Sequence, residues 1–95
     1  MENNNREIIY INIDDELHET VKGMISADYV ERFIAEYKQA KIRYYRISEI
    51  LRKANDNTLE FELTNKDLLI EQYKVMHKYI TILEQRAIAE DINLG

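Results

Sequence analysis

The feature that most constrains the fold of this chain is a strict three-four spacing of apolar residues between positions 30 and 54. Its members are Val30, Phe33, Tyr37, Ala40, Tyr44, Ile47, Leu51 and Ala54. Residues at this spacing lie along one side of an α-helix, and a strict seven-residue period is typical of a helix packed nearly parallel to another. The spacing predicts a helix over residues 27–55. It begins near Asp28, which with Glu31 resembles a capping box, and it stops in the turn-forming residues 55–57.

A second long helix is predicted over residues 65–92, and it is apolar on two faces. The first stripe consists of Leu69, Tyr73, Met76, Ile80, Leu83 and Ala87. The second stripe consists of Leu68, Val75, Tyr79, Ile82 and Ala89, with Gln72 and Arg86 as polar interruptions. Two helices of equal length joined by a short connection predict an antiparallel helical hairpin, which buries one stripe of each helix. The second stripe then predicts a homo-oligomer built through this helix.

The N-terminal part of the chain has the pattern of β-structure. Residues 1–6 are polar and are expected to be flexible. Ile9, Ile11 and Ile13 alternate along one strand, and Leu17 begins an alternation back toward Gly23, so residues 7–23 predict a β-hairpin. This hairpin could instead cover the second stripe and leave the protein monomeric.

The connection between the helices also alternates, at Leu59, Phe61 and Leu63, and predicts a short strand or an extended cover. Thr64 with Asp67 forms a second capping signature. The sequence therefore predicts a single domain over residues 1–95, α+β and mostly α, in which an N-terminal β-hairpin precedes a long antiparallel helical hairpin.

Composition narrows the classes of function. The chain has 95 residues and no cysteine, which excludes disulfides and thiolate metal sites. It has neither an apolar run of about 18 residues nor a signal peptide, so a soluble cytoplasmic protein without membrane contact is expected. The net charge of −5 argues against general binding of nucleic acid, which depends on a basic field.

No catalytic or metal-binding constellation is present in the sequence. His18 and His77 lack a second ligand at a recognised metal spacing, and neither Ser26 nor Ser48 lies in a nucleophile motif. The two glycines cannot form a phosphate-binding loop. The sequence therefore predicts a protein that is not an enzyme and that carries no metal and no cofactor.

One candidate for binding is the segment KQAKIRYYR, residues 38–46, which lies within a basic patch that extends to residue 53. Its predicted ligand-binding residues are Lys38, Lys41, Arg43, Tyr45 and Arg46. Cations can donate charge-assisted hydrogen bonds to phosphate, and a tyrosine ring can stack on a base, a combination that suits a small nucleotide. An alternative is that these cations form surface ion pairs with Glu36 and Glu49.

Arg86 is a further candidate because it interrupts an apolar stripe at an expected interface. A guanidinium in that place needs an anion, which could be a carboxylate of a neighbouring protomer or a ligand phosphate. Its stem could also lie along the apolar surface while its charged head reaches water.

Two blocks of the sequence resemble a known group of proteins. DYVERFIAEYKQAKIRY, followed by DLLIEQYKVMHKYITILEQRA, is similar to small bacteriophage helical-hairpin proteins that act as anti-defence signal sponges against Thoeris and CBASS immunity. The resemblance covers residues 28–92. It implies an oligomer, active in the host bacterial cytoplasm, that holds cyclic ADP-ribose variants or cyclic di- or trinucleotides between protomers. It also implies a ligand-contacting role for Arg86 and a base-stacking role for Phe61.

Three functions are consistent with these patterns. The first is sequestration of a cyclic nucleotide immune signal without catalysis. The second is inhibition of a host protein by binding to it, as an anti-CRISPR protein does. The third is a structural oligomer without a ligand.

Overall fold

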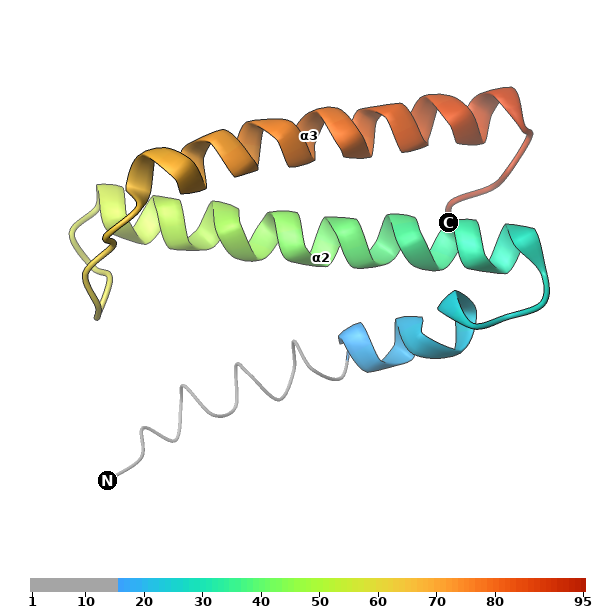
Figure 1. Cartoon of the computed structure of the whole chain (residues 1–95), viewed down its shortest axis with the longest axis horizontal. Coiled ribbons are helices and arrows are strands. Elements are labelled where there is room, and N and C mark those ends of the chain that lie inside the picture. The colour runs from blue at the N-terminus through green and yellow to red at the C-terminus, as the bar shows by residue number, and fades with distance from the viewer. Residues whose placement is uncertain (1–15) are drawn as a thin grey trace. The chain divides into compact units, whose positions relative to one another are not determined.

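The described part of this computed structural model, residues 16–95, is built from helices and loops and contains no strand. Residues 16–24 are helical, α2 spans Tyr29–Asn55 and α3 spans Lys66–Ala89 (Figure 1). The chain divides into two compact units, Met1–Ile42 (unit 1) and Arg43–Gly95 (unit 2), and the boundary falls within α2. Each unit is therefore described by itself.

The predicted β-hairpin over residues 7–23 is wrong in its second strand, because residues 16–24 are helical. The apparent alternation rested on three positions only. Leu17, Val21 and Met24 lie four and three residues apart, which is helical spacing, and the Thr20 hydroxyl donates a hydrogen bond to the Leu17 carbonyl at 2.6 Å. The predicted first strand, with Ile9, Ile11 and Ile13, lies outside the described residues. The described part of the chain is thus all-α rather than α+β.

Gly23 explains how this helical segment lies against α2 within unit 1. A Cβ atom placed on Gly23 would be 2.8 Å from the Ala35 Cβ and 3.2 Å from the Glu31 carbonyl oxygen. A side chain at position 23 would therefore force the two helices apart, which identifies Gly23 as a contact residue rather than the end of a strand. The Gln39 amide also meets the Met24 sulfur at 3.0 Å.

The start of α2 is capped by the residues immediately before it. The Val30 N–H donates to the Asp28 carboxylate at 2.9 Å, as expected of an N-cap residue. Ser26 completes the cap, since its hydroxyl accepts the Asp28 N–H at 3.0 Å and donates to Glu31. Arg32 donates to the Ser26 carbonyl oxygen at 2.7 Å. These bonds fix the turn between residues 24 and 29.

Both long helices end in the same hydrogen-bonded motif. At the end of α2, Asn57 has a φ of 59° and the Thr58 N–H donates to the Lys53 carbonyl at 2.9 Å. At the end of α3, Asp91 has a φ of 57° and the Ile92 N–H donates to the Ala87 carbonyl at 2.8 Å. This is the Schellman arrangement, in which a left-handed residue reverses the chain and satisfies the last carbonyls. It ends α3 at Ala89 rather than at the predicted residue 92.

The connection over residues 58–65 is a loop and not a strand. The N-cap of α3 is Asn65, which makes no side-chain capping bond, so the predicted capping by Thr64 is not formed. In unit 2 the chain reverses through this loop, so that the part of α2 after residue 43 and the first half of α3 form a helical hairpin (Figure 1).

The two stripes of α3 differ in burial. On the first stripe, Ile80, Leu83 and Ala87 are buried, and Leu69, Tyr73 and Met76 are half-buried. On the second stripe, Leu68, Val75, Tyr79, Ile82 and Ala89 are all exposed. One face of α3 therefore belongs to the core, and the neighbouring face is apolar surface.

Gly23→Ala should loosen unit 1. Alanine favours a helix by about 1 kcal/mol over glycine, but the steric overlap with Ala35 opposes this gain with a cost of about 1 to 3 kcal/mol. Hydrogen exchange of the amides in residues 16–24 should become faster. Gly23→Ala combined with Ala35→Gly should restore protection, and Lys22→Ala, an exposed change in the same helix, should leave it unchanged. Unchanged protection in Gly23→Ala would show that the close approach is unimportant.

Candidate functional site

An aromatic cluster joins α2 to α3 within unit 2. The ring of Tyr44 stacks on that of Tyr73, with centroids 4.8 Å apart and planes 10° from parallel, and the Tyr44 hydroxyl donates to the Tyr73 hydroxyl oxygen at 3.0 Å. His77 and Tyr45 approach the Tyr44 ring at 5.9 Å and 5.7 Å in tilted geometry. Stacked and tilted pairs contribute about 0.5 to 1.5 kcal/mol beyond their buried area. Tyr44 is therefore the centre of the cluster.

The predicted helices contain all the residues of this cluster, but the sequence did not predict that they are in contact. Tyr44 and Tyr73 lie on the apolar stripes of the two predicted helices, and the sequence suggests no partner for His77. The sequence did contain a signal for the contact of the two tyrosines. The apolar stripe of each helix carries an aromatic residue, and residues on facing stripes meet across a helical hairpin.

The hydroxyl pair changes the acidity of Tyr44. Its pKa is raised above the ordinary value of 10.0, first because of the hydrogen bond with Tyr73, and further by burial and by the neighbouring phenols. Burial and a hydrogen bond to the neutral form both oppose ionisation. Tyr44 therefore stays protonated well into alkaline conditions.

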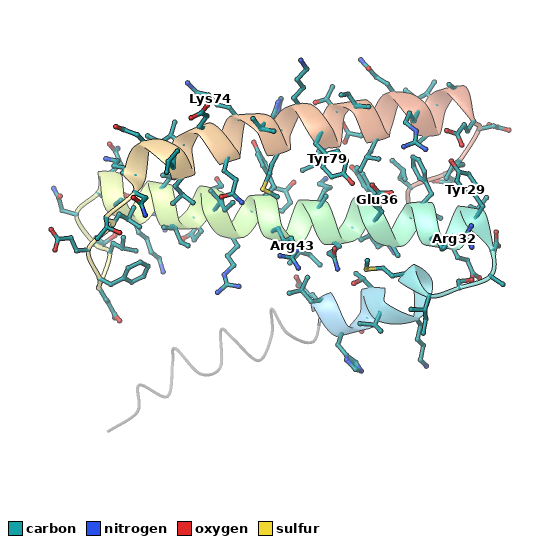
Figure 2. All side chains as sticks on the ribbon, viewed as in Figure 1. Tyr29, Arg32, Glu36, Arg43, Lys74 and Tyr79 are labelled. Atoms are coloured by element: carbon teal, nitrogen blue, oxygen red, sulfur yellow. The ribbon has the colours of Figure 1, made fainter. Side chains whose placement is uncertain are left out.

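Three of the predicted ligand-binding residues lie on α2 in unit 2. Arg43, Tyr45 and Arg46 are exposed, and Tyr45 is 58% exposed although its ring contacts Tyr44. Figure 2 shows Arg43 projecting from α2 on the side away from α3. Tyr45 and Arg46 are consecutive on α2, whereas Arg43 lies on nearly the opposite side of the helix from Tyr45, because residues two apart do not share a face. Tyr45 and Arg46 thus present a ring and a guanidinium group to solvent, with Tyr44 of the aromatic cluster beside the ring. We call these two residues the Tyr45 surface.

Two further predicted residues, Lys38 and Lys41, lie in unit 1. Lys38 is exposed, and the Lys41 ammonium lies 5.4 Å from the centroid of the Tyr37 ring. Such a cation–π contact contributes about 0.5 to 1 kcal/mol at an exposed site. Tyr37 itself is buried, so it is a core residue that also orients a lysine.

The remaining two predicted residues, Arg86 and Phe61, are in unit 2. The Arg86 guanidinium lies 3.5 Å from the Glu90 carboxylate on the same helix, and both side chains are partly exposed. Phe61 is exposed in the loop between the helices. A surface pair of this kind contributes only about 0 to 1 kcal/mol, so an anionic ligand could displace Glu90 from Arg86 at little cost.

The predicted surface pairing with Glu49 involves Arg52. Arg52 hydrogen-bonds to Glu49 and lies 3.2 Å from the Asp56 carboxylate, and its hydrogen bond to Glu49 lowers the pKa of that carboxyl group. Glu49 is the one acid between residues 38 and 53. Arg52 therefore has a structural role at the end of α2.

Residues 16–95 contain no group of three or more histidine, cysteine or acidic side chains that could hold a metal ion. Within the same range, no helix has the length and apolar content needed to cross a bilayer. The chemistry that the described surface offers is recognition by cations, exposed aromatic rings and an apolar helix face.

These features define a class of small helical binding proteins, and comparison with known proteins agrees with that class. The family model Sequestin matches residues 27–89, which is more than half of the chain, and the chain belongs to this family. The match includes all of α2 and α3. The family name denotes sequestration, which indicates a role in binding rather than in catalysis. No curated protein and no solved structure matches the chain.

Tyr44→Phe should weaken unit 2 because it removes the hydrogen bond to Tyr73 while keeping the ring stack. We expect a loss of about 1 kcal/mol at pH 8, measured by thermal unfolding. A raised pKa in the folded state contributes stability that is complete below pH 10 and is lost as the pH rises through the folded pKa. The wild type should therefore lose stability above pH 10, and Tyr44→Phe should lose less.

The control for this experiment is Tyr45→Phe, which leaves the Tyr44 and Tyr73 hydroxyls in place. It should unfold like the wild type at pH 8 and retain the same alkaline loss of stability. Identical pH profiles for wild type and Tyr44→Phe would contradict the role given to the hydroxyl pair.

Proposed function

We propose that this protein sequesters a cyclic nucleotide immune signal, without converting it, during phage infection of a bacterial host. The ligand is a cyclic ADP-ribose variant or a cyclic oligonucleotide, bound in the host cytoplasm. The observation that carries the proposal is the Tyr45 surface. An exposed ring that contacts an aromatic cluster and is followed on the helix by Arg46 offers what a nucleotide requires, a stacking plane and a phosphate donor.

Membership of the Sequestin family supports the binding part of this proposal. The nature of the ligand rests on the chemistry of the side chains and on the resemblance to phage signal sponges. A cyclic nucleotide carries few negative charges, so a small cationic surface can hold it despite the net charge of −5. A long nucleic acid would also meet the acidic remainder of the chain.

The proposal includes self-association through α3. The exposed second stripe supports it, because contiguous apolar surface on a small protein generally marks an interaction site. Arg86 lies within this stripe and Phe61 lies in the loop before α3, and the resemblance to phage signal sponges gives both residues a ligand-contacting role. Lys38 and Lys41 add cations on α2 in unit 1.

A panel of cyclic ADP-ribose isomers and cyclic di- and trinucleotides tests the proposal by isothermal titration calorimetry. One member should bind, and Tyr45→Ala should weaken its binding by about 5- to 150-fold, because loss of a stacked base costs about 1 to 3 kcal/mol. Tyr45→Phe keeps the ring and should retain affinity. Arg46→Ala should weaken binding, whereas Arg52→Ala removes the same charge from a structural pair and should not.

Arg86 gives a second measurement. Arg86→Ala should weaken binding of the same ligand, and Glu90→Gln, which removes the competing carboxylate, should preserve or strengthen it. Absence of binding across the whole panel would overturn the proposed ligand class.

A second candidate function is the inhibition of a host protein, and one observation in unit 1 favours it. Val21, Met24, Ile25, Tyr29 and Val30 are exposed around the turn that precedes α2. Apolar side chains gathered at a helix corner are suited to protein contact. Recovery of one stoichiometric host protein, lost on Ile25→Asp, together with no binding in the nucleotide panel, would favour this function.

A further inference from the structure

The second stripe of α3 leaves large apolar side chains on the surface of unit 2. Leu68 is 64% exposed and Val75 is 62% exposed, whereas Leu83 on the first stripe is fully buried. At 3.6 residues per turn, the second stripe lies about 100° around the helix from the first. Another helix can therefore pack on the second stripe without displacing the side chains that form the core.

The second stripe is nearly symmetric about Tyr79, which α3 carries close to its middle (Figure 2). Gln72 lies seven residues before Tyr79 and Arg86 lies seven residues after it. Val75 lies four residues before Tyr79, and Ile82 lies three residues after it. In an antiparallel pair, a second α3 runs in the opposite direction with its Tyr79 beside the first Tyr79. The apolar residues of the two stripes then face each other, and Gln72 of each copy faces Arg86 of the other.

The charges on the stripe favour this antiparallel direction. In a parallel pair, Arg86 would face Arg86 of the second copy inside an apolar interface, where two like charges are costly. In the antiparallel pair, the two arginines are about 21 Å apart along the helices. Each Arg86 is then level with Glu71 and Gln72 of the other copy, which supply a carboxylate and an amide. The near symmetry of the second stripe and this charge complementarity together favour a second copy of this chain as the occupant.

We propose that two copies of the chain pack α3 against α3 in antiparallel fashion, with a two-fold axis at Tyr79. The inference rests on the proposed self-association through α3, and adds its direction, its register and a partner for Arg86. Each dimer then contains two equivalent polar sites, in which Arg86 of one copy meets Glu71 and Gln72 of the other.

Cysteine cross-linking tests the register, since the chain has no cysteine of its own. Under mild oxidation, Tyr79→Cys should form a disulfide with the same position of the second copy, because both positions lie beside the two-fold axis. Leu68→Cys should not, because its two copies would be about 33 Å apart, while a disulfide needs Cα atoms within about 7 Å. An equimolar mixture of Leu68→Cys and Ala89→Cys should cross-link. Ile88→Cys, 82% exposed on another face of α3, is the control and should form no cross-link.

Two results would overturn the inference. Efficient self-linkage of Leu68→Cys would show a parallel pair, and a light-scattering mass of 11.4 kDa at micromolar concentration would show a monomer. The expected mass of the wild type is twice that value. Because neither experiment contains a nucleotide, both can succeed even if the proposed ligand class is wrong.

A charge exchange tests the partner of Arg86. Arg86→Glu and Glu71→Arg should each weaken the dimer, and the double variant Arg86→Glu, Glu71→Arg should restore it. These positions lie 15 residues apart on one helix, about 22 Å, so any coupling between them must arise between copies. Combining Arg86→Glu with Glu62→Arg, an exposed loop residue, should give no restoration. Equal dissociation of the exchanged double variant and the single variants would reject this contact.

Discussion

The constraint on which unit 2 depends is that α3 is apolar on two adjacent faces while only one of them is buried. Leu83 on the first stripe is completely inaccessible, and Leu68 on the second is mostly accessible. Among the described residues, 16–95, the apolar side chains cover the first face and leave the second one exposed. The first stripe therefore determines how the helical hairpin closes, and the second stripe determines what the folded chain can bind.

The helices could be predicted because their signals are long and repeated. A seven-residue period from Val30 to Ala54 leaves little choice of structure, and the turn at residues 55–57 ends α2 as its composition indicates. The β-hairpin failed for the opposite reason. A three-residue alternation at Leu17, Glu19 and Val21 is too short to distinguish a strand from a helix. The close approach of Gly23 to Ala35 joins two helical segments across a turn, so a local pattern cannot show it.

The candidate site could likewise be predicted only where its features depend on local structure. Spacing and residue type identified Arg43, Tyr45 and Arg46 as cations and a ring on one helix, because helical geometry is local. They could not reveal that Tyr44 stacks on Tyr73, since this contact requires the register of the hairpin. The stack matters for the proposed site because Tyr45 packs on Tyr44. A ring that is already ordered loses less conformational entropy when a base stacks on it, so the cluster pre-organises the Tyr45 surface.

Arg86 joins the two proposals and also allows them to be separated. It has a weak partner in Glu90 on its own helix, and it has five donors, so a carboxylate from a second copy and a ligand phosphate can both use it. If Arg86 acts only in assembly, the charge exchange with Glu71 should restore nucleotide binding together with the dimer. If it contacts the ligand directly, the exchange should restore the dimer but not the affinity, because a glutamate at position 86 would repel a phosphate.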